Sequence, residues 1–234
     1  MPSAQHVQTE ERFSSVGGDL LSLLSEIDRR STRNLDSLHD RGSVLFAEGE
    51  PARGIYILRA GSATVSISSS EGRVVILRLV HAGAVLGLNA VLQNSSYEAT
   101  VKTLGPSRVN FVSRAQLMEL VENNDAVAAA VLESVSQELA QFIDRARLLL
   151  LPQTARAKFA QLLIELSNEP TGNDSRSGVI DKVFTHEELA QMIGSSRETV
   201  TRLLASLVRR QVVRVTSQSI LIRDRAALEE IARS

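Results

Sequence analysis

The segment 185–207, THEELAQMIGSSRETVTRLLASL, constrains the fold of this chain more than any other stretch. Apolar residues recur at helical spacing on both sides of Gly194, which predicts two short amphipathic helices. Gly194 supplies the turn between them, because a positive φ is cheap only for glycine. The predicted buried positions are Leu189, Ala190, Met192 and Ile193 in the first helix, and Val200, Leu203, Leu204 and Leu207 in the second.

Both helix starts also carry capping signals. Thr185 is followed three residues later by Glu188, and Ser195 by Glu198, so each pair predicts a capping box. Any packed helix pair can show such caps and stripes, so these features support the two helices without assigning them a function.

The start of the second helix carries a polar row that an ordinary packed helix pair does not need. Arg197, Glu198, Thr201 and Arg202 fall between its apolar positions and are expected to point outward. In the DNA major groove, an arginine can bond guanine O6 and N7 together, and a glutamate can accept from a cytosine amino group. The segment therefore predicts a helix-turn-helix whose second helix enters the major groove of double-stranded DNA.

Composition excludes several other classes of protein. The 234 residues are 43% hydrophobic and 23% charged, which is ordinary for a globular chain of one large or two modest domains. No apolar run reaches the ~18 residues that span a bilayer, and the start lacks a signal-peptide pattern, so we expect a cytoplasmic protein without membrane contact. The absence of cysteine excludes disulfides, thiolate zinc sites and cysteine-ligated iron–sulfur clusters.

The first half of the chain is predicted to be a β-roll with flanking helices, spanning 19–123. Residues 1–18 are polar and are expected to form a flexible tail, and apolar spacing from Asp19 to about Leu38 predicts a helix. From Gly42 to about Ser113, short β-rich runs alternate with glycines, as in a compact antiparallel barrel or roll. The clearest predicted strands are 54–58, 63–68 and 74–80.

Residues 114–151 are predicted to be helical, and 124–151 carry a narrow apolar stripe. The stripe follows the a/d pattern of a two-stranded coiled coil, and its members are Leu132, Val135, Leu139, Phe142, Ala146 and Leu149. A helix packed on its own domain is the alternative. The long stripe favours a homodimer, which suits a reader of palindromic DNA.

Residues 152–234 are predicted to form a winged helix-turn-helix domain. Pro152 ends the long helix, a new helix runs from about Thr154 to Ser167, and 168–178 form a polar loop. After the helix pair, 212–215 and 219–223 predict a hairpin that serves as the wing. A last helix is expected at about 225–232. The whole chain is thus predicted to be of the α+β class.

With this order of elements, the chain resembles the Crp/Fnr family of bacterial transcription regulators over nearly its full length. The run SRETVTR at 196–202 is very close to the recognition-helix signature of that family, and THEELAQMIG at 185–194 matches its first helix. The roll adds FAEG at 46–49, GIYI at 54–57 and Gly61. The resemblance implies a homodimeric regulator of transcription, with RNA polymerase as an expected partner.

The resemblance also implies roles for individual residues. In the family, the matching arginine, glutamate and second arginine read a TGTGA-like half-site, which assigns base contacts to Arg197, Glu198 and Arg202. Phosphate contacts, which position a protein without specifying sequence, are expected from Thr185, Ser196 and Thr199.

The roll departs from the members of the family that bind cyclic AMP. After Gly87, Leu88 stands where the ribose-binding glutamate belongs, and Glu98 and Ala99 replace the phosphate-binding arginine and its hydroxyl neighbour. A carboxylate facing a desolvated anion costs affinity, so cyclic AMP bound in the usual way is not expected. Such a roll binds another small ligand, binds a cyclic nucleotide differently, or leaves DNA binding constitutive.

Other functions fit the sequence less well. Haem needs an axial ligand such as histidine, and of His6, His39, His81 and His186 only His81 is suitably placed, at a strand end where a solvated histidine is commoner. An enzyme would need clustered ligands, a phosphate-binding loop or a nucleophile elbow, and the sequence has none of these. A nucleotide-binding adaptor would keep the phosphate arginine and lose the reading helix. We therefore expect no cofactor, no metal site and no catalysis.

Overall fold

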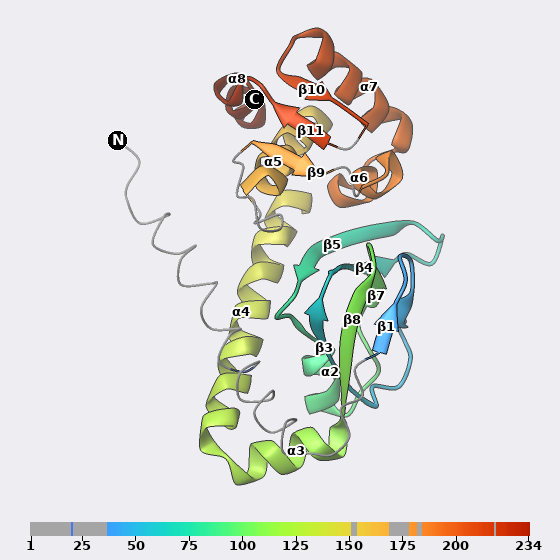
Figure 1. The fold of residues 1–234 in the computed structure, drawn as a ribbon, viewed down its shortest axis with the longest axis vertical. Coiled ribbons are helices and arrows are strands. Elements are labelled where there is room, and N and C mark those ends of the chain that lie inside the picture. Colours follow the sequence, from blue (N-terminus) through green and yellow to red (C-terminus); the bar gives the residue numbers. More distant parts are fainter. Residues whose placement is uncertain (1–19, 21–36, 151–153, 169–177, 182–183, 218) are drawn as a thin grey trace. The chain divides into compact units, whose positions relative to one another are not determined.

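The computed structural model of the protein describes Leu20 and residues 37–150, 154–168, 178–181, 184–217 and 219–234 (Figure 1). The chain forms two compact units. The first contains the residues up to Ser68 together with Arg78–Asp144, and the second contains Ser69–Leu77 together with Arg145–Ser234. Antiparallel sheets and helices occur in both, which confirms the predicted α+β class.

The roll is built on two four-stranded sheets with the orders β1-β8-β3-β6 and β2-β7-β4-β5, whose strands belong to the first unit except for the residues of β5 before Arg78. The strands are β1 (Ser37–His39), β2 (Val44–Phe46), β3 (Gly54–Ala60), β4 (Ser62–Ser68), β5 (Val74–His81), β6 (Val85–Leu86), β7 (Thr100–Thr103) and β8 (Ser107–Ser113). The central pairs β3–β8 and β4–β7 are antiparallel. The predicted roll is therefore confirmed, and each of the three predicted strands is one or two residues longer than expected.

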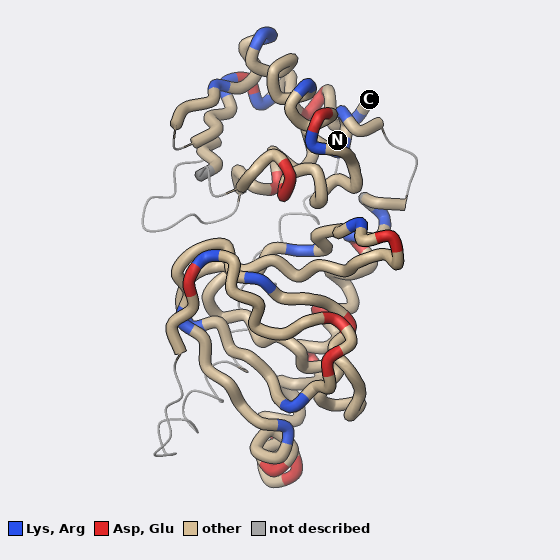
Figure 2. Tube along the Cα trace, turned by 90° about the vertical axis from the view of Figure 1, so that its right-hand side faces the viewer, with Lys and Arg blue, Asp and Glu red and all other residues tan. Residues whose placement is uncertain are grey.

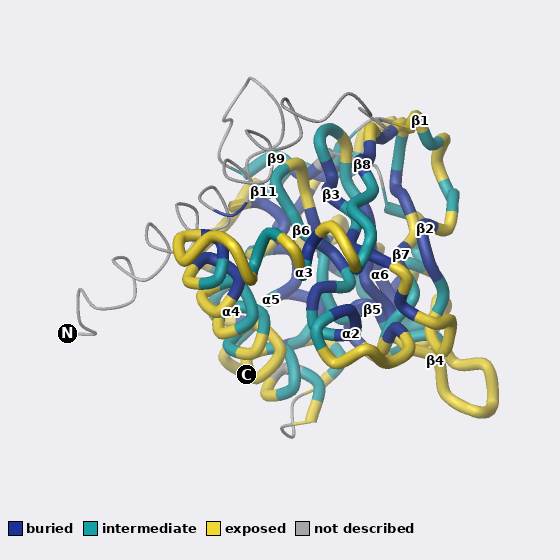
Figure 3. Tube along the Cα trace, turned by 90° about the horizontal axis from the view of Figure 1, so that it is seen from below, coloured by how far each residue is buried: buried dark blue, intermediate teal, exposed yellow. Residues whose placement is uncertain are grey.

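Three helices complete this unit: α2 (Leu88–Gln93), α3 (Arg114–Asn123) and the start of α4 (Asp125–Leu150). They share one apolar core with the sheets, because Leu88, Leu117 and Val127 are buried in the same cluster as the strand residues. Figure 3 shows much of α4 in the intermediate and exposed colours, so only one side of this helix packs on the roll.

The helical region predicted at 114–151 is divided into α3 and α4 at Asn124. This residue has an extended backbone, with φ −146° and ψ 103°. Its side-chain oxygen accepts hydrogen bonds from the backbone N–H groups of Ala126 at 3.0 Å and Val127 at 3.3 Å. Asn124 therefore acts as the cap from which the long helix α4 starts.

Among its described residues, the second unit contains the end of α4, the helices α5 to α8 and one three-stranded sheet. The helices are α5 (Ala155–Asn168), α6 (His186–Ile193), α7 (Arg197–Arg209) and α8 (Arg225–Arg233). The strands β9 (Val179–Asp181), β10 (Val213–Val215) and β11 (Ser219–Ile222) lie in the antiparallel order β10-β11-β9. The predicted hairpin is confirmed as β10 and β11, whereas β9 was not predicted.

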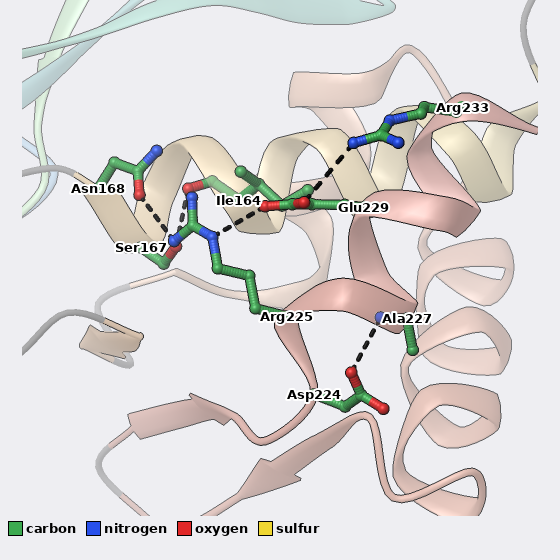
Figure 4. Close-up of polar contacts among 8 residues, drawn as sticks. All are labelled: Ile164, Ser167, Asn168, Asp224, Arg225, Ala227, Glu229 and Arg233. Carbon is green, nitrogen blue, oxygen red and sulfur yellow. Dashed lines mark hydrogen bonds and ion pairs between the residues drawn. The ribbon is translucent and has the colours of Figure 1, made fainter. Parts of the chain in front are cut away.

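Helix α8 is fixed against α5 by a small polar network (Figure 4). Asp224 caps α8 by accepting from Ala227 N at 2.9 Å. Arg225 then donates to Glu229 within α8 and to Asn168 at the end of α5, both at 3.0 Å. Leu228 of α8 is fully buried, so apolar packing holds this helix in place. The polar network helps to fix the orientation of α8.

One sequence expectation is wrong at its boundary, and several lie outside the described residues. The helix predicted from 19 to about 38 does not reach that far, because Ser37 and Leu38 pair with β8 as part of β1. Leu20 is helical and fully buried, which agrees with the start of that prediction. The predicted tail at 1–18, the rest of the 19–36 helix, the break at Pro152 and most of the polar loop at 168–178 lie outside the described residues.

Candidate nucleic-acid interface and roll pocket

The turn between α6 and α7 has the geometry that its sequence predicts. Gly194 ends α6 with φ 63°, in the left-handed region that glycine adopts at low cost. Thr185 starts α6 with a complete capping box, in which its hydroxyl accepts from Glu188 N and the Glu188 side chain accepts from Thr185 N. The predicted apolar positions are buried on both helices, except that Leu203 is half-buried.

The capping box predicted for Ser195 and Glu198 is wrong by one residue. Ser196 is the cap of α7, and its hydroxyl accepts from Thr199 N at 3.2 Å. The backbone N–H of Ser195 instead donates to Ala190 O at 2.9 Å and so belongs to the turn that closes α6. Because Ser195 belongs to the turn, the cap of α7 lies one residue later, at Ser196.

The polar row of α7 forms one side of an open hollow. Arg197, Glu198 and Arg202, the three predicted base-reading residues, line it together and are exposed. The hollow is completed by Thr201, Ala205 and Arg209, which sequence analysis did not assign to DNA contact. Four of the six lining residues, at positions 197, 201, 205 and 209, are spaced four apart and so share one face of the helix. This spacing is visible in the sequence and could have identified Thr201, Ala205 and Arg209.

The electrostatics of the row suit base recognition at neutral pH. Hydrogen bonds from the backbone N–H of Glu198 itself and from Ser196, with Arg197 nearby, hold the pKa of the Glu198 carboxyl below its usual value. This side chain is therefore a carboxylate, which can only accept hydrogen bonds, beside two guanidinium groups that can only donate. Such a pattern can match the donors and acceptors of a base-pair edge.

The hydroxyls predicted to contact phosphates are bonded within the protein. Thr185 Oγ1 donates to Glu188 Oε2 at 2.9 Å, and Ser196 Oγ lies 3.1 Å from Thr199 Oγ1. These residues stand at the first turns of α6 and α7, where unpaired N–H groups and the helix dipole attract anions. They therefore mark two helix ends suited to phosphate groups, with the hydroxyls serving as caps.

Charge is not concentrated on either unit as a whole. Lys and Arg are interspersed with Asp and Glu along the trace of each unit (Figure 2), and the full chain has a formal net charge of −1. Exposed Arg214 on β10 and Arg223 after β11 add positive charge to the wing. Any attraction of this protein to a polyanion such as DNA must therefore come from local arginines rather than from net charge.

The four residues predicted to line the ligand pocket of the roll do lie together. Gly87, Leu88, Glu98 and Ala99 border one cavity of about 40 Å³. A cavity of that size holds a few water molecules, whereas sites for small ligands ordinarily measure ~300–1,000 Å³. Gly87 has φ 79°, and a Cβ there would stand 2.6 Å from Tyr97 Cε1, so a larger residue cannot replace it without strain.

Side chains of the roll and of α4 meet at this cavity. Arg78 forms an ion pair with Glu138 at 2.5 Å and donates to Gln141 at 3.0 Å. Asn89 donates to Glu98 at 2.5 Å. Sequence analysis missed Arg78 and Glu138, because residues 60 positions apart leave no local signal.

The predicted dimer stripe on α4 is exposed over part of its length. Leu132, Leu139 and Phe142 have 69%, 59% and 54% of their surface exposed. Val135 differs, because it is half-buried and packs against the core of the roll. Ala146 and Leu149 are half-buried, and the exposed Ile143 and Leu150 extend the apolar surface beyond the predicted set.

The remaining expectations concern metals, haem and membranes. His81 is the last residue of β5 and is exposed, as predicted. In the part of the chain that the structure describes, no group of three His, Cys, Asp or Glu side chains could hold a metal ion. Among the same residues, no helix is both long and apolar enough to cross a membrane.

Comparison with known families and proteins gives consistent matches. The cyclic nucleotide-binding domain matches residues 39–124, and the Crp-like helix-turn-helix domain matches residues 157–231. The transcriptional regulator SdrP of Thermus thermophilus is 30% identical over 199 residues, which cover 82% of this chain and 92% of SdrP. A CRP-like cAMP-activated global transcriptional regulator of Mycobacterium tuberculosis is 24% identical over 82% of this chain and 86% of its own length.

Solved structures show the same fold. FixK2 from Bradyrhizobium japonicum superposes with a TM-score of 0.74 at 22% identity, over 85% of this chain and 97% of FixK2. The cyclic nucleotide-binding match covers strands β2 to β8 of the roll, and the Crp-like helix-turn-helix match covers the helix pair α6 and α7.

Proposed function

This chain belongs to the Crp/Fnr family of DNA-binding transcription regulators, and from that premise we propose that it reads a palindrome of TGTGA-like half-sites as a homodimer. The observation that carries the proposal is the exposed hollow lined by Arg197, Glu198 and Arg202. In this reading, the three side chains contact base edges. The helix starts marked by Thr185, Ser196 and Thr199 meet phosphates.

Each part of the chain has its own task in this proposal. The roll at 19–123 is the sensor-like domain, 124–151 is the dimerisation helix, and 152–234 binds DNA. The exposed stripe of α4 pairs with its copy in a second subunit, through Leu132, Leu139 and Phe142 above all. The two α7 helices then enter successive major grooves about 34 Å apart on one face of the DNA.

We propose that this binding does not depend on cyclic AMP. The cavity of about 40 Å³ is too small for a nucleotide, and the ion pair of Arg78 with Glu138 together with the Asn89–Glu98 hydrogen bond occupies its polar groups. Glu98 also presents a carboxylate where an anion would lie. The protein then acts in the cytoplasm together with RNA polymerase, and without catalysis of its own.

A second candidate is a regulator that responds to a different small ligand in the same cavity. The observation in its favour is that the polar groups of Arg78, Asn89 and Glu98 still line the cavity. Opening it to ligand size would require the Arg78–Glu138 pair to separate. A ligand of this kind would be small and would replace those polar contacts.

A fluorescence-anisotropy titration tests the proposal. A labelled TGTGA-N6-TCACA duplex and a scrambled duplex are titrated with protein at about 150 mM salt, each with and without cyclic AMP, because only the ratio of the two affinities reports specificity. We expect preference for the palindrome that cyclic AMP leaves unchanged. Preference only with cyclic AMP would overturn the assignment of the cavity. Equal affinity for both duplexes would overturn the half-site, or require a ligand in the cavity.

A further inference from the structure

The hydroxyl of Thr201 is held on the helix side of the hollow by two hydrogen bonds. Thr201 Oγ1 donates to Arg197 O, one turn earlier in α7, at 2.9 Å. It also lies 2.9 Å from Nδ1 of His186, the first residue of α6. Thr201 is nevertheless exposed and lines the same hollow as Arg197 and Arg202.

Counting protons shows where the hydroxyl proton of Thr201 goes. A threonine hydroxyl has one proton, and two acceptors within the protein lie within reach of it. It donates to Arg197 O when Nδ1 of His186 carries a proton and donates to the hydroxyl, and an unprotonated Nδ1 is a second acceptor for the same proton. In both tautomers of His186 the proton stays within the protein. The hydroxyl therefore has no proton to offer a base, although many polar side chains read DNA by donating one.

The methyl group of Thr201 is left as its recognition group. The methyl and the hydroxyl occupy different positions on the same Cβ, and the hydroxyl is turned towards the backbone of α7 and towards α6. In the major groove, the C5-methyl of thymine is the one apolar group on a base edge, and a threonine methyl can contact it.

We propose that Thr201 is a further specificity-determining residue, whose methyl group recognises the C5-methyl of one thymine in each half-site. The inference rests on the proposed function, since it requires α7 to lie in the major groove. It adds an apolar reading position to the charged contacts of Arg197, Glu198 and Arg202.

The test pairs a change in the protein with the matching change in DNA. The wild-type protein first selects its preferred duplex from a random pool, so that the test does not depend on the TGTGA sequence. Each thymine of one half-site is then replaced in turn by uracil, which lacks only the C5-methyl. Affinities of wild-type protein and Thr201→Ser, which lacks only the side-chain methyl, are measured by anisotropy on every duplex.

We expect wild-type protein to lose about fourfold in affinity at one thymine, the effect of one buried methyl-sized group. Thr201→Ser should bind the thymine duplex about fourfold more weakly and show no further loss with uracil at that position. The inference would be overturned if replacing thymine by uracil lowered the affinity of both proteins equally, or if no such replacement changed the affinity of the wild-type protein. Neither result would affect the proposed function. Failure of the wild-type protein to select any sequence would overturn both.

Two further variants separate recognition from structure. Thr201→Val removes the hydroxyl but keeps a methyl group, and valine has one strongly preferred rotamer in a helix. The preference for thymine over uracil at the sensitive position should therefore persist in this variant. Thr199→Ser removes the same methyl from a residue outside the hollow, so thymine and uracil duplexes should be affected equally. A thymine effect lost in Thr201→Val but kept in Thr201→Ser would show that the hydroxyl is the reading group, against the inference.

Discussion

Arg197 and Arg209 offer a comparison of two arginines in one hollow. Arg197 is the first residue of α7, at the end that reaches base edges in the proposed complex, whereas Arg209 is the last. We expect Arg197→Ala to cost about 1–3 kcal/mol of binding and to relax the preference at one base position. Arg209→Ala should weaken binding to all sequences alike. Anisotropy titrations on single-base variants of the duplex measure both, and a uniform loss for Arg197→Ala would make it a phosphate contact instead.

Tyr97 links the cavity region of the roll to its stability. Its ring stacks on Phe46 with centroids 3.9 Å apart, and its hydroxyl donates to Gly54 O at 2.5 Å. Tyr97→Phe leaves that carbonyl without its partner, so we expect a loss of about 1–3 kcal/mol in the free energy of unfolding. Urea denaturation measures the change, and an unaltered midpoint would show that water replaces the hydroxyl.

The same residue predicts how stability changes at alkaline pH. Burial raises the pKa of the Tyr97 phenol above its usual value of 10.0. The stability contributed by the neutral phenol is therefore complete below pH 10 and is lost as pH rises through the raised pKa. In Tyr97→Phe the alkaline loss should be smaller, and Tyr56, whose pKa burial also raises, should contribute to the part that remains.

Local spacing explains why the residues of α7 could be predicted and those of the cavity only in part. Arg197, Glu198 and Arg202 are neighbours along one helix, so their shared face follows from the sequence. Arg78 and Glu138 come from a strand and a helix far apart in the chain, and only folding brings them together.

Helix caps provide a prediction at the scale of single elements. Thr185 and Ser113 each complete a capping box, at the start of α6 and of α3. Replacement of either by Ala should lower the free energy of unfolding by about 0.5–2 kcal/mol. Only Thr185→Ala should also weaken DNA binding, because α6 positions α7. A similar loss of DNA affinity in Ser113→Ala would show that the effect comes from general destabilisation.

Elements with a strong local pattern were predictable, and short elements that need a distant partner were not. The helix pair and the β10–β11 hairpin follow from apolar periodicity and turns. Strand β9 has three residues and exists through its pairing with β11, and β1 likewise pairs with β8. The misplaced cap at Ser195 has another cause, since two adjacent serines offer the same chemistry and the turn geometry selects the second.

The oligomeric state gives a prediction for the whole molecule. Leu139→Glu places a charge in the exposed apolar stripe of α4, and two-fold symmetry repeats it in the partner. The loss of about 1.5–3 kcal/mol of burial from each subunit should weaken dimerisation by about a hundredfold or more. Sedimentation equilibrium measures this, with Leu38→Glu as the control because Leu38 is 85% exposed on β1. A monomeric wild-type protein at micromolar concentration would contradict the pairing of α4.

The exposed stripe of α4 has a consequence for how a gene under this regulator would respond. Below the dimer dissociation constant, the amount of dimer rises with the square of the amount of chain, by mass action. A twofold increase in synthesis then gives about a fourfold increase in the species that occupies the promoter. In the proposed dimer that needs no ligand, the rate at which the cell makes the protein becomes the input signal, and dimerisation through α4 makes the output steeper than that input.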